Sequence, residues 1–245
     1  MHDHFFFFLN SGLWWVGFSG SVIYIALVIW LGFFFRRSER EYSFRKGFAM
    51  LLLMRELFFY GYLWYNDAFH LADSLPLHLC GISYLCSIFA LYTLNASVFE
   101  FLLLLGIGGA VQSIITPEMT HGYSPYLFLD YYIAHATIIL TPIYLYYVVG
   151  LRLRHRAFFR IWIVAHVLLF SVGITNYFLH SNYIYLCEPP KVDNPLVTGG
   201  FPYHLIGFEI FGTIHILLFY FIFSRLTVKP AGNTTNLPDP PSINQ

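Results

Sequence analysis

Charged side chains are scarce in this chain of 245 residues. Asp, Glu, Lys and Arg make up 11% of the sequence, whereas hydrophobic residues make up 58%. A soluble domain carries about 25% charged residues, so this sequence has too little polar surface to cover a globule in water. Several apolar runs approach the roughly 20 residues that a helix needs to cross a bilayer. The composition therefore excludes a typical soluble domain and predicts a membrane protein.

An excess of charge and a framework of cysteines are also absent. The 13 basic residues balance 13 acidic ones, so the composition predicts no nucleic-acid partner. The three cysteines, Cys80, Cys86 and Cys187, are too few for a disulfide scaffold, and their spacing fits no zinc motif. A single disulfide from Cys187 to Cys80 or Cys86 stays open if both lie on an oxidising face. The N-terminus lacks the basic region and cleavage site of a signal peptide, so we expect no removable leader.

Long apolar runs dominate what is present. Each run is near the length that a bilayer requires, and the loops between them are short, which favours helices over the alternating segments of a β-barrel. We predict an all-α, seven-helix membrane bundle over residues 1–228 and a disordered cytoplasmic tail over residues 229–245. The predicted spans are residues 13–35, 46–65, 77–94, 99–116, 126–149, 157–179 and 203–224.

Basic residues are distributed unevenly around these spans. Eleven of the 13 Lys and Arg residues follow the first, fifth and seventh spans. Because positive charge is retained on the cytoplasmic side, the N-terminus is expected outside and the C-terminus in the cytoplasm, in the cell membrane. Six spans would put these groups on opposite sides, so the asymmetry supports seven.

Polar side chains gather at the outer ends of the predicted helices. Polar groups inside a membrane usually face the interior of a bundle, so this clustering predicts a polar cavity open to the external face. No His–His or Asp–His pair within a span has the spacing of two metal ligands on one helix face, and we predict no metal and no cofactor. The clustered residues are His78 and Cys80 in the third span, Asp130, Tyr131 and His135 in the fifth, and His204, Glu209 and His215 in the seventh.

Arg55 and Glu56 lie near the middle of the second span. Adjacent residues on a helix point about 100° apart, so we expect them not to pair with each other. Each then needs a partner on another helix, and Glu209 or His215 is the candidate for Arg55. Two roles stay open for Arg55, which are a buried structural network and the binding of a head group or carboxylate.

The third span begins with Ser74-Leu75-Pro76-Leu77-His78-Leu79-Cys80. Proline suits the first turn of a helix, and Ser74 is expected to cap it. Cys80 then lies in the first one or two turns, where the positive end of the helix stabilises a thiolate. The alternative is that Cys80 is a small buried hydrophobic residue with no reactivity.

Cys80 and His135 are the candidate catalytic residues. His135 enters from the same face of the membrane as Cys80, and histidine is the usual base for a nucleophilic cysteine. Asp130 and Tyr131 are the named candidates to orient the second ring nitrogen of His135, and another residue of the bundle stays open. Such a pair in a lipid-accessible cavity suits acyl transfer, in which a thiolate attacks an ester and a thioester forms.

Three segments carry a resemblance to a known family. They are Pro76-Leu77-His78-Leu79-Cys80, Asp130-Tyr131-Tyr132-Ile133-Ala134-His135, and Asn182-Tyr183-Ile184-Tyr185-Leu186-Cys187-Glu188-Pro189-Pro190. This pattern resembles the bacterial YwaF-type integral membrane family, which is similar to the eukaryotic transmembrane protein 164 family, over residues 52–223. The resemblance implies a multi-pass membrane protein whose remote relatives are acyltransferases or lipid hydrolases.

The resemblance also suggests site residues. It places Cys80 at the position of the nucleophile and His135 at that of the histidine, and it implies membrane lipids as partners with a phospholipid as substrate. The eukaryotic pattern arranges cysteine and histidine differently around the proline, so His78 is open to a shifted role. The acyl acceptor and the oligomeric state are not predicted.

The segment Tyr-Leu-Cys-Glu-Pro-Pro lies in the predicted outer loop between the last two spans. Its prolines predict a rigid turn or a short re-entrant segment over the cavity. This segment is either a structural lid or, through Glu188 or Asn194, a contact for a polar head group. Two other functions stay open. A solute transporter would suit the intramembrane charges and helix breaks at Gly106, Gly108 and Gly109, although no inverted repeat is visible. A receptor or scaffold would suit the seven-helix topology alone.

Overall fold

The computed structural model describes residues 5, 6, 8–190 and 199–225. Within these residues the chain is all-α, as predicted, apart from one two-stranded ribbon. The helices are α1 (Gly12–Arg37), α2 (Glu41–Tyr65), α3 (Leu79–Thr93), α4 (Ala96–Phe101), α5 (Ile107–Ile115), α6 (Pro125–Tyr144), α7 (Ala157–Leu179) and α8 (Tyr203–Arg225), with the π-helical turns η1 (Leu102–Gly106) and η2 (Leu145–Val149) and the 3-10 turn η3 (Tyr183–Tyr185). The predicted tail lies outside the described residues.

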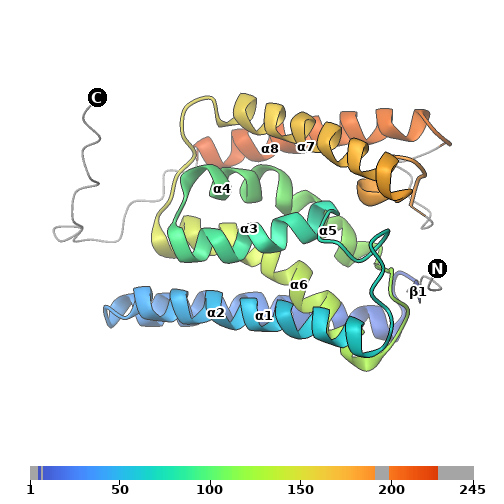
Figure 1. Ribbon diagram of the computed structural model, residues 1–245. Helices are drawn as coiled ribbons and strands as arrows, with labels where there is room; N and C mark the ends of the chain where they lie inside the picture. The colour runs from blue at the N-terminus through green and yellow to red at the C-terminus, as the bar shows by residue number, and fades with distance from the viewer. Residues whose placement is uncertain (1–4, 7, 191–198, 226–245) are drawn as a thin grey trace.

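The helices form three layers (Figure 1). The first layer contains α1 and α2, the second contains α3, α4 and α5, and the third contains α7 and α8, while α6 runs obliquely between the first two. Strand β1 (Phe5–Phe6) pairs with β2 (Glu118–Met119). Strand β1 and the C-terminal end of α8 lie at opposite ends of the bundle (Figure 1). Each of the seven predicted spans corresponds to one helical segment, and all except the oblique α6 segment run roughly along the long axis of the bundle (Figure 1).

Five helical segments are long and apolar enough to cross a membrane. They are Gly12–Arg37, Ala96–Ile115, Pro125–Val149, Ala157–Leu179 and Tyr203–Arg225. Helix α2 has 25 residues but carries charges near its middle, and α3 is apolar but has only 15 residues. At 1.5 Å per residue, α3 spans about 22 Å, which is shorter than a hydrocarbon core of about 30 Å.

The core of the bundle is built around α6. Leu140 and Tyr144 of α6 are almost completely buried, and α6 packs against α1, α3 and α5. Gly17 and Gly32 of α1 face α6 so closely that a methyl group at either would overlap a tyrosine ring of α6. Small residues commonly allow membrane helices to approach in this way. By contrast, α8 buries few side chains, and its exposed ones are mostly large and apolar, which suits contact with lipid.

The fourth predicted span is one helical segment with a π turn in it. Gly106 keeps helical backbone angles, with φ −59° and ψ −44°, so the glycines of this segment do not break the helix. Instead, they make room for neighbours. A methyl group would lie 2.9 Å from the His215 ring if placed at Gly108, and 3.2 Å from Leu79 if placed at Gly109. The predicted helix breaks, which had favoured a transporter, are therefore wrong.

A buried carboxylate holds α4 to the start of α7. Glu100 is completely buried, and its oxygens accept hydrogen bonds at 2.9 Å from the guanidinium groups of Arg154 and Arg160. The sequence analysis did not identify this cluster. Two charge-assisted partners compensate for the desolvation of a single carboxylate. The cluster therefore fixes the end of the bundle where basic residues gather.

Candidate active site

A cavity of about 950 Å³ lies inside the bundle, between the N-terminal half of α3 and helices α5 to α8. Side chains from the C-terminal half of α2 and from the loops at residues 73–78, 116–122 and 184–190 complete its walls. Among the described residues, two predicted site residues, Glu188 and His204, do not line it. The predicted residues that do line it are Arg55, Glu56, His78, Cys80, Asp130, Tyr131, His135, Glu209 and His215.

Helix α3 begins later than predicted. It starts at Leu79, and His78 precedes it in an extended conformation with φ −65° and ψ 150°. The predicted cap at Ser74 is wrong, and Pro76 lies before the helix. The Ser74 hydroxyl instead accepts a hydrogen bond from the His70 N–H at 3.0 Å and so closes a turn. Cys80 is nevertheless in the first turn, as predicted.

The first turn of α3 leaves its main-chain N–H groups available. The first hydrogen bond into the helix runs from Ile82 N to His78 O at 3.0 Å, so the N–H groups of residues 79–81 have no acceptor within the helix. A methyl group on Gly81 would lie 2.9 Å from Pro76 Cα. Glycine is therefore needed for the chain before the helix to fold back against its start.

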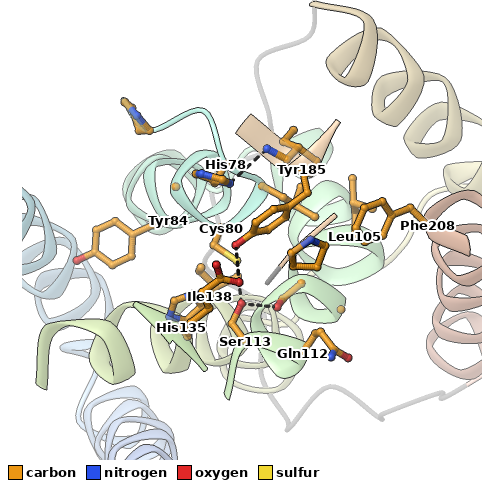
Figure 2. A pocket seen from close by; sticks show the side chains of 18 of the residues that line it. His78, Cys80, Tyr84, Leu105, Gln112, Ser113, His135, Ile138, Tyr185 and Phe208 are labelled. Carbon is orange, nitrogen blue, oxygen red and sulfur yellow. Dashed lines mark hydrogen bonds between the residues drawn. The ribbon is translucent and has the colours of Figure 1, made fainter. Parts of the chain in front are cut away.

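The thiol of Cys80 contacts Ser113 of α5. Cys80 Sγ lies 3.6 Å from Ser113 Oγ, and Ser113 Oγ donates its own hydrogen to Gly109 O at 3.0 Å. Because a serine hydroxyl has one hydrogen, the thiol is the donor to Ser113. Figure 2 shows Cys80 and Ser113 in the cavity, with the hydroxyl end of Tyr185 directed toward them. Sequence analysis missed Ser113, although its spacing of four from Gly109 places both on one helix face.

Tyr131 connects this thiol with His135. The Tyr131 hydroxyl donates to Ser113 O at 2.8 Å and lies close enough to Cys80 for electrostatic interaction. The ring of Tyr131 packs against the imidazole of His135, with 4.1 Å between the ring centroids. Tyr131 thereby bridges the two predicted catalytic residues.

The imidazole of His135 has a fixed orientation. Its Nδ1 lies 2.7 Å from the main-chain oxygen of Tyr131, and because a carbonyl oxygen only accepts, Nδ1 carries the hydrogen. In the neutral ring Nε2 is then an acceptor, and it has no hydrogen-bond partner in the described part of the chain. Tyr131, one of the two predicted partners, therefore holds His135, while Asp130 does not. Cys80 and His135 line one cavity without a direct hydrogen bond between them.

Arg55 is neutralised by two carboxylates. It pairs with Glu56 Oε2 at 2.7 Å and with Asp130 Oδ2. Both predictions for Arg55 are wrong, since it does pair with its neighbour, and its partner on another helix is Asp130. The side chains of Arg55 and Glu56 leave the helix in different directions, but the Arg55 side chain is long enough to reach Glu56. Its guanidinium carbon Cζ lies over the Tyr84 ring, 4.7 Å from the ring centroid. Because its own charge is compensated, Arg55 is a structural residue of the bundle interior and is not a free anion-binding group.

The two predicted site residues of α8 that line the cavity, Glu209 and His215, form part of its wall. Glu209 Oε2 lies 3.3 Å from His166 Nε2 and joins α8 to α7. His215 packs against Gly108, and its buried Nε2 has no hydrogen-bond partner in the residues that the structure describes. Neither residue reaches Arg55.

The loop after α7 covers the cavity, as its prolines predicted. Tyr185 and Pro190 line the cavity from this loop. His204 is buried and supports it, with Nε2 2.9 Å from Tyr185 O. Glu188 is exposed and outside the cavity, while its main-chain N–H donates to Asn182 at 3.1 Å. Asn194, the other predicted head-group contact, lies outside the described residues.

The described cysteines are all free thiols, so no disulfide joins Cys187 to either cysteine of α3. In the same part of the chain, no group of three His, Cys, Asp or Glu side chains is placed to hold a metal ion. The polar groups that line the cavity include a thiol, imidazoles, carboxyls and phenols.

The apolar helices around this internal cavity define a multi-pass integral membrane protein. The model of the TMEM164 family matches residues 7–220, and the chain belongs to this family. The match confirms the resemblance to the transmembrane protein 164 family, while the YwaF-type name stays a prediction. No curated protein and no solved structure matches the chain.

Proposed function

We propose that this protein is a membrane-embedded acyltransferase or lipase that uses Cys80 as nucleophile and His135 as general base. The observation that carries this proposal is a thiol in the first turn of α3 that shares a cavity with an imidazole whose Nε2 is an open acceptor. Helix N-termini stabilise thiolates, and histidine commonly activates cysteine. Membership of the family supports a membrane protein, and the chemistry is our inference from the side chains.

The proposed reaction has two halves. In the first, Cys80 Sγ attacks the ester carbon of a phospholipid, its proton goes to His135 Nε2, and the alcohol leaves with that proton as the thioester forms. In the second, water or a lipid hydroxyl loses a proton to His135 and attacks the thioester, which releases Cys80 as a thiol. In the resting protein the thiol proton is directed to Ser113. Catalytic hydrogen bonds are often absent from free enzymes and form in the substrate complex.

The walls of the cavity favour a lipid as substrate. Leu168 and Leu169 of α7 and Ile206 and Ile210 of α8 line one side. Helix α8 is also among the helices most exposed on the outside of the bundle. Apolar side chains of both third-layer helices thus offer contacts for an acyl chain inside the cavity.

A hydrolytic or transfer role for His135 is tested with His135→Asn. The protein is reconstituted in liposomes with a phospholipid that carries an alkyne-tagged acyl chain, and hydroxylamine-sensitive label on the protein is measured over time. Asparagine keeps a donor toward Tyr131 O but is no base, so we expect the initial labelling rate to fall about 10²- to 10⁴-fold. The lipid released in the same samples is measured as turnover.

The matched control is His180→Asn. His180 ends α7 with φ 51°, a conformation that asparagine adopts readily, so labelling should stay at the wild-type rate. Wild-type labelling in His135→Asn would eliminate His135 as the base. If the wild-type protein gave neither label nor released lipid, the proposed enzymatic activity itself would be wrong.

We also propose that all seven helical segments cross the membrane, with the N-terminus outside and the C-terminus in the cytoplasm. Helix α3 is short, but the turns of residues 71–78 precede it and extend the segment. An odd number of crossings agrees with the opposite positions of β1 and the end of α8, and it puts the basic clusters on one side. The cell membrane is the proposed location.

Cys187 reports this orientation. It is an exposed thiol in the loop between α7 and α8, whereas Cys80 and Cys86 are partly buried in α3. A membrane-impermeant maleimide added to intact cells should label the protein, and Cys187→Ser should remove that label. Labelling that appears only after the cells are permeabilised would reverse the proposed orientation.

A further inference from the structure

The loop that follows α7 and covers the cavity, residues 180–190, is called the lid. It contains two consecutive residues in a strained backbone conformation. Ile184 has φ 58° and Tyr185 has φ 55°, both in the left-handed region. This region is unfavourable for side chains with a Cβ and most unfavourable for a β-branched residue such as isoleucine. Strain of this kind persists only where the surroundings fix it, and it concentrates at functional sites.

Three parts of the bundle fix this turn. The Ile184 N–H donates to His78 Nδ1 at 3.3 Å, and His204 Nε2 donates to Tyr185 O at 2.9 Å. On the preceding residue, the Asn176 side chain bonds both the N–H and the carbonyl of Tyr183 at 2.9 Å. The turn is therefore held from the start of α3, from α7 and from α8.

These hydrogen bonds to the turn fix the position of the Tyr185 hydroxyl group. The Tyr185 phenol lines the cavity, donates to Glu118 Oε2 at 3.3 Å, and lies close enough to Cys80 for electrostatic interaction. Burial, with Glu118 and Cys80 nearby, raises the pKa of the Tyr185 phenol well above its usual range. The phenol therefore keeps its proton and acts as a hydrogen-bond donor at neutral pH. Figure 2 shows the ring directed from the lid toward Cys80.

We propose that Tyr185 is a further catalytic residue, which donates a hydrogen bond to the oxyanion formed when Cys80 attacks an acyl ester. This inference rests on the proposed function. As the bond from Cys80 Sγ to the carbonyl carbon forms, the electron pair of the C=O bond moves to its oxygen. Tyr185 and the free N–H groups at the start of α3 then stabilise that negative charge. When the intermediate collapses, the C=O bond re-forms and the alkoxide leaves with the proton held by His135.

The hydroxyl can exchange one acceptor for the other at little cost. Its 3.3 Å contact with Glu118 is longer than the roughly 2.7–2.8 Å of a typical O–H···O hydrogen bond. Glu118 belongs to β2 (Glu118–Met119), which pairs with β1 (Phe5–Phe6), so this acceptor is held in place by the ribbon. Glu118 thus orients the hydroxyl until the oxyanion forms beside it.

The test compares two reactions of Cys80 in Tyr185→Phe. Acylation by the alkyne-tagged phospholipid passes through an oxyanion, whereas alkylation by iodoacetamide displaces iodide and forms none. Full-length protein in liposomes should show acylation slowed about 10²- to 10³-fold, the usual effect of removing an oxyanion donor. Alkylation should proceed at the wild-type rate. This contrast separates a donor to the oxyanion from a residue that only supports the fold or activates the thiol.

The matched control is Tyr132→Phe. Its hydroxyl is buried without a hydrogen-bond partner in the described residues, its ring faces Gly17 of α1, and it is not among the residues that line the cavity. Both reactions should run at wild-type rates in this variant.

The remaining outcomes decide against the inference in different ways. Equal loss of acylation and alkylation in Tyr185→Phe would assign Tyr185 to the thiol or the fold and overturn its oxyanion role. Unchanged acylation in that variant would also overturn it while leaving the proposed function intact. A wild-type Cys80 that is alkylated but never acylated would overturn the proposed function, and the role of Tyr185 would fall with it.

Discussion

Replacing Cys80 with serine is expected to abolish the hydroxylamine-sensitive acyl label and lipid turnover. Loss of a nucleophile costs more than about 10³-fold in activity, because the residual catalysis comes only from binding and oxyanion stabilisation. A serine hydroxyl is a far weaker nucleophile than a thiolate, and an ester on serine resists the neutral hydroxylamine that cleaves a thioester. The label is measured by in-gel fluorescence before and after hydroxylamine treatment.

Cys86→Ser is the internal control for this experiment. Cys86 lies in the same helix, is also partly buried, and packs against the hydrophobic core. The substitution changes the same atoms six positions further along α3, so label and turnover should persist. If the Cys80→Ser protein were labelled as strongly as the wild type, or if only the Cys86→Ser protein lost the label, the nucleophile would be a cysteine other than Cys80.

Arg55→Met is expected to be the most destabilising single substitution among the charged residues of the cavity. Removing one partner of a buried ion pair costs about 3–5 kcal/mol, because it leaves an uncompensated charge. Here it leaves two carboxylates, Glu56 and Asp130, without their shared cation. Asp130→Asn should cost less, since Arg55 keeps Glu56. The free energy of unfolding is measured by denaturant titration in mixed micelles.

Arg37→Met supplies the comparison for a surface position. Arg37 is exposed in the last turn of α1, and such substitutions usually stay within about 0.5 kcal/mol. The expected order of destabilisation is Arg55→Met, then Asp130→Asn, then Arg37→Met. If Asp130→Asn lowered the free energy of unfolding more than Arg55→Met, Asp130 would have an important partner other than Arg55. The ion pairs assigned to this cluster would then be wrong.

The positions of the helices were largely predictable, and the local irregularities were not. Apolar runs at bilayer length locate α1, α7 and α8 because lipid contact selects hydrophobic residues along their whole length. The ribbon of β1 and β2 has only two residues in each strand, too few for a period-two pattern, and its strands lie more than 100 residues apart. The turns η1 and η2 depend on how the helices pack, and no local motif encodes them.

The candidate site was predictable as a group of residues but not as a set of contacts. The clustering of polar residues toward one end of the predicted spans indicated a shared cavity, and Cys80 and His135 both line it. The pairing of Arg55 was missed because spacing along a helix describes the backbone, whereas a guanidinium group reaches well beyond it. Ser113 and Tyr185 were missed as neighbours of Cys80, since the thiol meets them only after α5 and the lid have docked.

The packing of α1 on α6 also bears on how the chain is made. Synthesis proceeds from the N-terminus, so α1 enters the membrane before its partner in the core exists. The basic residues of α1 are confined to its last turn, and its first turn has no acidic residue. The helix can therefore lie in contact with lipid until α6 is synthesised. Once α6 has emerged, Gly17 and Gly32 of α1 receive the tyrosine rings of α6. The first helix inserted is thus among those whose final position is decided late, after the residues of α6 have been synthesised.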